Sequence, residues 1–291
     1  MICSLCPRRC HAVRNERGGG ACGAPESARL ARAALHFGEE PCISGTRGSG
    51  ALFFSGCPLH CRFCQNEAIS QHGFGKTVTA ARLADIFREL EAQGAHNLNL
   101  VSPTPYVPVI RQALQLYTPS VPIVYNTSGY ERIETLRALD GVVDVYLPDL
   151  KYPDNELAQA LSGVSDYVEI ATAAILEMAR QTGPMQLDAD GIATRGTMVR
   201  HLVLPGQTRH SIAVLDWLAD KLPRGSFVSL MFQYTPVRDI PGFPALSRTL
   251  TRRERDKVWD HLLARGLTDG YVQETGSAKA AFIPEFDLTG V

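Results

Sequence analysis

Apolar residues recur along most of the chain in short continuous runs that alternate with stretches of helical spacing. Residues 50–55 form one such run, and its length and flanking glycine predict a buried strand. Leu83, Ile86 and Leu90 then recur three or four positions apart, which places them on one face of a helix. The main part of the chain therefore begins with a predicted strand and an amphipathic helix.

The same alternation continues through the residues that follow. Further predicted strands cover residues 97–101, 121–125, 142–147, 198–204 and 227–232. Further predicted helices cover residues 106–117, 131–139, 155–161, 166–180, 212–222 and 251–266. Strands that alternate with helices predict a parallel sheet with helical crossovers. Since a complete eight-fold barrel takes about 250 residues, we expect an α/β protein with an incomplete (β/α)6 TIM-like barrel.

The first 45 residues differ in composition from the rest. They are rich in cysteine, arginine and glycine, carry no long apolar periodicity and are too polar to form a core alone. We therefore expect a Cys-rich N-terminal extension over residues 1–45 and a partial barrel over residues 46–291. Chemistry in parallel barrels lies at the carboxyl ends of the strands. On the predicted elements, that rule brings to one rim Cys57, Asp149, Pro205 and Gln233.

Composition and charge exclude some classes of partner. Lys and Arg total 29 against 30 for Asp and Glu, so we expect no general attraction to nucleic acid or anionic membranes. No run is long and apolar enough to cross a bilayer, and the first residues carry no secretion signal. We therefore expect a cytoplasmic protein with no nucleic-acid or membrane partner, in which disulfides are rare.

Seven of the eight cysteines fall into two clusters of short spacing, which favours metal ligands over cross-links. One cluster, Cys57, Cys61 and Cys64, forms a C-x3-C-x2-C loop directly after the first predicted strand. A [4Fe–4S] cluster held by protein alone takes four thiolates. Three thiolates leave one iron open, as in catalytic metal sites. A zinc or ferredoxin-like structural site is the alternative interpretation.

This loop resembles that of the radical S-adenosylmethionine (SAM) superfamily. In that family the open iron binds SAM, and reductive cleavage yields a 5′-deoxyadenosyl radical that abstracts hydrogen from a substrate. Phe63, directly before the third cysteine, matches the aromatic residue that the family places near the adenine. The resemblance implies a [4Fe–4S] cluster, SAM and an electron donor such as flavodoxin or ferredoxin.

Further motifs are similar to those of glycyl-radical-enzyme activases. Residues 48–57, continued by Gln65 and Asn66, look like the start of these enzymes. Residues 149–151 match their Asp-Leu-Lys motif, and residues 200–206 match their strand ending in Pro-Gly. The resemblance is closest to the uncharacterised pyruvate-formate-lyase-activating-enzyme-like branch, and it covers nearly the whole chain. It implies an oxidoreductase and does not establish the substrate.

Polar residues at strand ends are the candidates for holding SAM or substrate. Ser102 and Thr104 stand where many family members have a Gly-Gly-Glu segment, with a proline-stiffened turn as the alternative. Asp149 and Lys151 lie two apart on an extended segment and so point to one side, as SAM-orienting residues or as an ion pair. Arg200 suits the methionyl carboxylate of SAM. The same rim is expected to include Asn126, Thr127, Ser128, Gln233 and Tyr234.

The second cysteine cluster lies in the N-terminal extension, where a C-x2-C-x3-C-x11-C pattern contains Cys3, Cys6, Cys10 and Cys22. Four thiolates suit either a closed zinc site or a second iron–sulfur cluster. Either metal would supply folding energy to a polar, Gly-rich segment. Cys42 belongs to neither cluster and is expected to be a buried free thiol.

Three functions follow from these features. The first is abstraction of hydrogen from a glycine of a partner glycyl-radical enzyme, so that a protein is the substrate. The second is radical SAM modification of a small molecule or peptide. The third, from another class, is a metal-stapled electron-transfer or binding protein without SAM chemistry.

Overall fold

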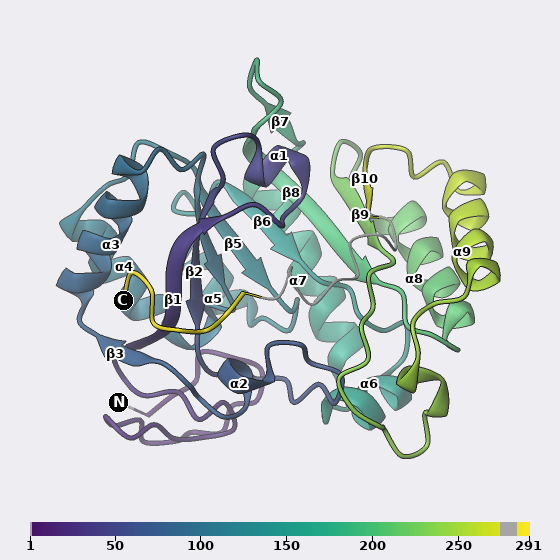
Figure 1. Cartoon of the computed structure of the whole chain (residues 1–291), viewed down its shortest axis with the longest axis horizontal. Coiled ribbons are helices and arrows are strands. Elements are labelled where there is room, and N and C mark those ends of the chain that lie inside the picture. The colour runs from purple at the N-terminus through teal and green to yellow at the C-terminus, as the bar shows by residue number, and fades with distance from the viewer. Residues whose placement is uncertain (1, 274–283) are drawn as a thin grey trace.

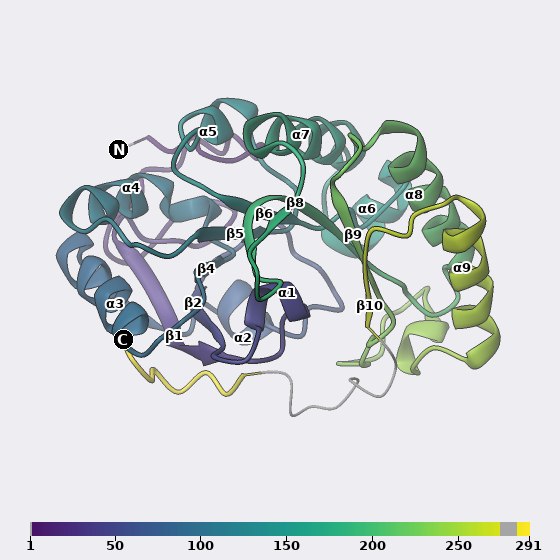
Figure 2. The same cartoon turned by 90° about the horizontal axis from the view of Figure 1, so that it is seen from above.

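A single curved sheet forms the centre of the molecule, and helices cover its outer face (Figure 1, Figure 2). The computed structural model describes residues 2–273 and 284–291. Seven neighbouring strands of the sheet are parallel: β2 (Ser49–Phe54), β4 (Leu98–Val101), β5 (Ile123–Thr127), β6 (Val145–Pro148), β8 (Ala193–Leu202), β9 (Phe227–Met231) and β10 (Gly270–Gln273). Within the described residues the sheet does not close, which confirms the incomplete parallel barrel. β10 adds a parallel strand to the six that the hydrophobic pattern predicts.

The helices follow the predicted alternation. They are α3 (Ala80–Ala92), α4 (Val107–Leu116), α5 (Ile133–Arg137), α6 (Asn155–Ser162), α7 (Tyr167–Thr182), α8 (Thr208–Lys221) and α9 (Arg252–Ala264). Local sequence sets their ends: the side chain of Thr79 caps α3 and accepts a hydrogen bond from the backbone N–H of Arg82. The apolar face of α3, with Leu83, Ile86 and Leu90, is buried. Among the described residues, none of the helices combines the length and the hydropathy needed to cross a membrane.

Short elements complete the chain. They are α1 (Pro41–Ser44), α2 (Glu67–Ser70), the 3-10 helices η1 (Thr104–Tyr106) and η2 (Pro244–Ser247), and the strands β3 (Lys76–Val78) and β7 (Gln186–Leu187). β7 pairs with β8 in a hairpin that projects from the body (Figure 1). α1 packs inside the curve of the sheet, where Cys42 and Ile43 join a buried cluster with residues of β5, β6 and β8.

An antiparallel strand, β1 (Ala28–His36), lies next to β2. β3 pairs with the first residues of β1, and the C-terminal residues Leu288 and Thr289 make backbone hydrogen bonds to Ala31 and Ala33. Residues 28–36, which the sequence assigned to the N-terminal extension, thus contribute a strand to the main sheet. The irregular part of the extension ends before β1 begins.

Candidate functional site

A cavity of about 320 Å³ lies at the carboxyl ends of the parallel strands. The cysteines of the loop after β2 line it, and so do the polar residues that follow β4, β5, β6 and β9. Of the candidates chosen from the sequence, the lining contains Cys57, Cys61, Phe63, Cys64, Ser102, Asn126, Thr127, Ser128, Asp149, Lys151, Arg200 and Gln233. The strand-end rule therefore located most of this surface. Pro205 and Tyr234 do not line the cavity, and the hydroxyl of Tyr234 donates to the carbonyl of Leu246 at 2.8 Å.

The cluster loop, residues 56–64, carries three thiols, two of which lie against hydroxyl groups. The sulfur of Cys61 lies 2.9 Å from the hydroxyl of Ser162, and that of Cys64 lies 3.3 Å from the hydroxyl of Ser70. Burial raises the pKa of Cys57, and the neighbouring sulfurs of Cys61 and Cys64 raise it further. Burial also raises the pKa of Cys61, so the free thiols of Cys57 and Cys61 would stay protonated near neutral pH and stable thiolates there need a bound cation.

These residues fit a [4Fe–4S] cluster better than a single ion. Among the described residues, no three His, Cys, Asp or Glu side chains are arranged to hold one metal ion. The thiolates of a cluster bind different irons, so their sulfurs need not converge on one point. Three cysteines, Cys57, Cys61 and Cys64, lie in the described part of the cavity wall. The fourth iron of the cluster is therefore left for another ligand.

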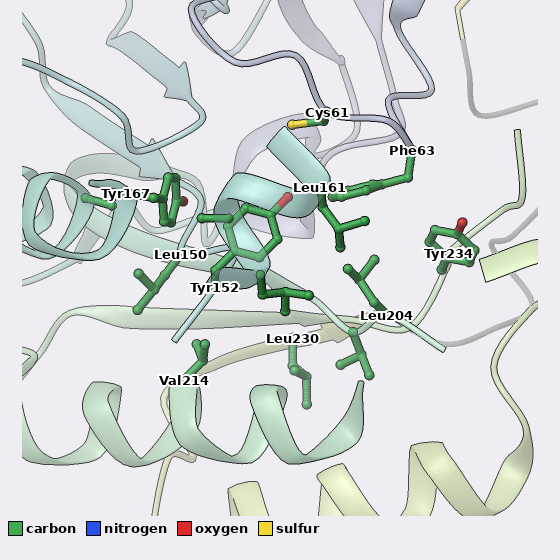
Figure 3. Close-up of a cluster of buried hydrophobic side chains, with 14 of the residues drawn as sticks. Cys61, Phe63, Leu150, Tyr152, Leu161, Tyr167, Leu204, Val214, Leu230 and Tyr234 are labelled. Atoms are coloured by element: carbon green, nitrogen blue, oxygen red, sulfur yellow. The ribbon is translucent and has the colours of Figure 1, made fainter. Parts of the chain in front are cut away.

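Figure 3 shows how the hydrophobic core supports the cluster loop. Cys61 and Phe63 belong to the same buried cluster as Tyr152, Leu161 and Leu204. Because these core residues come from the segments around α6 and the end of β8, the loop is fixed by packing as well as by hydrogen bonds. The three sulfurs are thereby held at the cavity wall.

Asp149 and Lys151, which follow β6, form an ion pair of 2.5 Å at the cavity wall. Burial disfavours the charge on Lys151, but the carboxylate of Asp149 and the sulfur of Cys61 outweigh this and raise the pKa of the lysine. Both sequence interpretations of the two residues are thus compatible: they pair with each other, and they face the cavity beside the cysteines. The positive charge of Lys151 favours thiolate at Cys61, whose pKa it lowers against the effect of burial.

Arg200 makes contacts that differ from the sequence expectation. Its guanidinium donates to the carboxylate of Glu40 at 2.9 and 2.6 Å and also to Glu39. The expected partner was the carboxylate of SAM, but in the structure two protein carboxylates already occupy these donors. Glu40 is fully buried, and although burial opposes its charge, Arg200 lowers its pKa. We name Glu39, Glu40 and Arg200 the floor cluster, of which Glu39 and Arg200 line the cavity.

Sequence analysis missed the acidic half of the floor cluster. Glu39 and Glu40 lie in the connection between β1 and α1, and Glu39 also accepts from the amide of Asn99 at 3.0 Å. Their partner Arg200 lies 160 positions further along the chain from Glu40. Two adjacent acidic residues before a proline were the only local signal, and they do not reveal a partner so far away.

The two candidates in the segment after β4, Ser102 and Thr104, lie in different surroundings. Ser102 lines the cavity and has a positive φ of 58°, a left-handed conformation that is uncommon for a residue other than glycine. Thr104 is buried outside the cavity lining, and its hydroxyl donates to Glu131 at 2.5 Å. A role for Thr104 in holding SAM is therefore not supported, because the turn at Ser102 directs it elsewhere.

His201, next to Arg200 on β8, is a core residue. One ring nitrogen lies 2.7 Å from the carbonyl of Leu150 and the other 2.9 Å from the hydroxyl of Ser211. Burial lowers its pKa to about 4. The imidazole is thus neutral and hydrogen-bonded through both nitrogens, away from the cavity lining.

The N-terminal cysteines lie near one another. The sulfurs of Cys22 and Cys3 are close enough to help raise the pKa of Cys6 to about 12, although burial is the main cause. Cys22 is in turn affected by Cys3 and Cys10, so the four thiols form one connected group. Cys42 is fully buried and unpaired, as expected from its isolation in the sequence.

Comparison with known proteins decides the family. Residues 52–218, more than half of the chain, match the model of the radical SAM superfamily. The chain belongs to the radical SAM superfamily. It is therefore an enzyme whose cofactors are a [4Fe–4S] cluster and SAM, and the electron-transfer alternative falls away. The uncharacterized protein MJ0674 of Methanocaldococcus jannaschii is 32% identical over 266 residues, which span 88% of this chain and 72% of that protein.

Solved radical SAM structures share the fold. A radical SAM methyltransferase from Sphaerobacter thermophilus superposes with a TM-score of 0.53 at 16% identity, covering 77% of this chain and 66% of that chain. Streptococcus suis SuiB bound to precursor peptide SuiA gives a TM-score of 0.51 at 15% identity, covering 75% of this chain and 46% of that chain. This chain thus spans less than half of SuiB, and the likenesses show the fold alone.

Proposed function

We propose that this radical SAM enzyme takes a hydrogen atom from a protein or peptide segment, with a glycine as the target residue. The observation that carries the proposal is the cavity volume of about 320 Å³. Cavities for one small ligand typically measure roughly 300–1,000 Å³, and this one also has to take SAM. Little room remains for a bulky substrate, whereas a glycine on an extended segment presents a Cα without a side chain.

The chain's own residues bind and orient the reacting groups. When bound and reduced by one electron, the cluster and SAM supply a 5′-deoxyadenosyl radical that takes the hydrogen atom. Cys57, Cys61 and Cys64 would hold the cluster, and Lys151 provides positive charge beside the thiolates. We propose that Ser102, which lines the cavity, contacts SAM. The electron would come from a donor such as flavodoxin or ferredoxin.

Deuterium transfer tests the substrate class. The protein is reconstituted anaerobically and given SAM, dithionite and an extract of its source organism grown on α-deuterated glycine. The extract is divided by ultrafiltration into macromolecular and low-mass fractions. We expect deuterated 5′-deoxyadenosine with the macromolecular fraction only, and its loss after protease treatment of that fraction.

The opposite distribution would contradict the proposal. Deuterium transfer from the low-mass fraction alone would indicate a small-molecule substrate. Formation of 5′-deoxyadenosine without deuterium from either fraction would exclude glycine as the target. The Cys61→Ala variant, incubated in parallel, controls for 5′-deoxyadenosine already present in the extract.

A further inference from the structure

We propose that the four N-terminal cysteines hold a thiophilic metal centre that clamps two loops of the active cavity. The ligands are Cys3, Cys6, Cys10 and Cys22, and the centre is an iron–sulfur cluster, because among the described residues no three cysteines converge on one metal ion, whereas the thiolates of a cluster bind different irons. This inference is independent of the substrate proposed above.

The N-terminal segment, residues 2–27, lacks the usual means of holding its shape. An isolated bridge between Ile2 and Val13 is its only β pairing among the described residues. The cysteines are unpaired, and two of them, Cys3 and Cys6, are each only 8% exposed at the centre of the segment. A segment this short and polar needs a cross-link or a bound metal to stay folded. Metal binding to thiolates supplies folding energy directly.

Arg14 supports thiolate charge in this segment. The residue is only 7% exposed, and its guanidinium lies 3.9 Å from the sulfur of Cys3. It also donates to the carbonyls of Ala24 and Pro25. A buried guanidinium is stabilised by a nearby anion, and metal-bound thiolate at Cys3 would be one.

The segment holds the cluster loop at two points. The side chain of Arg8 donates to the carbonyl of Pro58 at 2.8 Å, one residue after the first cluster cysteine. A ring nitrogen of His60 lies 2.8 Å from the carbonyl of Ala21. Both contacts join backbone of one segment to a side chain of the other, so the two segments are fixed relative to each other.

One proposed ligand touches the cluster loop directly. Gly56, immediately before Cys57, has a φ of 93°, and a Cβ built there would lie 2.8 Å from the carbonyl oxygen of Cys22. Only glycine allows this approach. The backbone of a proposed metal ligand therefore packs against the residue that starts the cluster loop.

The same segment reaches the loop after β4. Arg14 donates to the carbonyl of Pro105 at 2.5 Å, and its guanidinium lies 5.4 Å from the ring centroid of Tyr106. That loop begins with Ser102, which lines the cavity. The N-terminal segment thus contacts both the loop that carries the cysteines and a loop that faces SAM in the proposed site.

Buried side chains connect the two cysteine sets through the protein. Burial is the main cause of the raised pKa of Tyr130, to which the nearby sulfur of Cys6 adds, and its ring stacks on Tyr167 with centroids 6.2 Å apart. Tyr167 meets Tyr152 edge to face, as Figure 3 shows. The hydroxyl of Tyr152 lies 2.5 Å from that of Ser162, which contacts Cys61. Packed side chains therefore connect the N-terminal segment to Cys61 of the cluster loop.

Metal content of a cluster-loop variant tests the site itself. In the triple variant C57A/C61A/C64A, the N-terminal set is the only cysteine cluster left. We expect iron and sulfide in the amounts of one iron–sulfur cluster per chain. A folded triple variant that binds no stoichiometric iron and sulfide, or that binds zinc in their place, would overturn the proposal.

Hydrogen exchange tests the clamp. In the C3S/C6S variant with its main cluster loaded, we expect peptides over residues 56–64 and 102–106 to exchange about tenfold faster, as for loss of roughly one hydrogen bond. Peptides from α9 should not change. The Cys42→Ser variant, which removes a cysteine outside both sets, is the matched control and should exchange like the parent.

Arg8→Met covers the case in which C3S/C6S does not fold. It removes the contact with Pro58 while all eight cysteines remain. Faster exchange over residues 56–64, with metal content unchanged, would support a clamp that acts through this contact. Unchanged exchange of the cluster loop in Arg8→Met and in folded C3S/C6S would show that the segment does not hold the loop.

Discussion

At the scale of single residues, the site consists of sulfur and charged side chains that compensate one another. Lys151 stands between Asp149 and the sulfur of Cys61, and Arg200 stands between Glu39 and Glu40. Lys151 and Arg200 thus each have a carboxylate partner, which is the condition for burying charge without a large penalty. The charges of these side chains at the cavity wall therefore compensate one another.

Cys61→Ala should abolish formation of 5′-deoxyadenosine. Two thiolates would remain for a cluster that needs three protein ligands to keep one iron open. The measurement is chromatography after anaerobic reconstitution and reduction with SAM. Cys42→Ser, matched in chemistry and buried elsewhere, should keep the activity of the parent. Cleavage retained by a folded Cys61→Ala variant would contradict the assignment of the cluster ligands.

His201 should make the free energy of unfolding fall as the pH is lowered. Its pKa is lowered from 6.5 to about 4, so between these values the unfolded chain binds a proton that the folded chain does not. Stability from this residue is present above about pH 6.5 and is lost as the pH falls toward 4. We expect a loss of about 2 kcal/mol between about pH 7 and pH 5.

Denaturant unfolding at several pH values checks this expectation. His201→Gln should flatten the pH dependence between about pH 7 and pH 5, whatever it does to stability at neutral pH. His72→Gln, which removes an exposed imidazole whose side chain is 71% accessible, is the matched control for the loss of a histidine elsewhere. An equal slope in His201→Gln and the parent would mean that the histidine does not titrate as its burial implies.

At the scale of elements, hydrophobic periodicity predicted the strands and helices whose burial depends on residues close in the sequence. The alternation of apolar runs located six parallel strands and their helices, because burial of one face depends on nearby residues. β10 was missed because it is four residues long and only half-buried. β1 was missed because its burial comes from pairing with β2 and from the C-terminal tail, which no local pattern contains.

For the candidate site, too, the sequence predicted positions along each strand but not contacts between distant segments. The strand-end rule brought the cysteines, Asp149 and Lys151 to one cavity because the ends of parallel strands share a rim. The floor cluster was not predictable, since it depends on a pairing between distant segments. Whether Ser102 or Thr104 faces the cavity depends on one backbone dihedral angle, which periodicity does not determine.

Capping fixes the start of α9. The side chain of Thr251 accepts from the backbone N–H of Glu254 at 3.3 Å, and Glu254 accepts from the N–H of Thr251 at 2.9 Å. Thr251→Ala should lower the free energy of unfolding by about 1 kcal/mol, measured with denaturant. Thr251→Ser keeps the hydroxyl and should lose less. Equal stability of the Ala and Ser variants would show that this cap contributes nothing.

At the scale of the whole molecule, β1, an early strand of the chain, pairs with the C-terminal tail. Leu288 donates to the carbonyl of Ala31 at 3.0 Å, and Ala33 donates to the carbonyl of Thr289 at 2.8 Å. Arg32 and Asp287 add an ion pair of 2.7 Å. The tail thus covers the outer side of β1 beyond β3, where an uncovered strand edge would invite pairing with other chains.

Deletion of residues 284–291 should increase aggregation. It leaves the backbone groups of residues 31–33 without their partners in the tail. Light scattering and size-exclusion chromatography of the deletion and the parent at equal concentration measure the effect. Asp287→Ala removes the ion pair with Arg32 and the hydrogen bond from the N–H of Thr289 but keeps the backbone pairing with β1, and it should behave nearly like the parent. A deletion as soluble as the parent would mean that the edge is protected in another way.

The contact between β1 and the tail also bears on biosynthesis. β1 leaves the ribosome early, but residues 287–289 are translated some 250 positions later. At roughly 5–20 residues per second, the nascent chain presents an open strand edge for on the order of tens of seconds. Slower translation lengthens this interval and molecular chaperones would shield it. Yield in a recombinant host should therefore rise with chaperone supply and fall when translation is slowed.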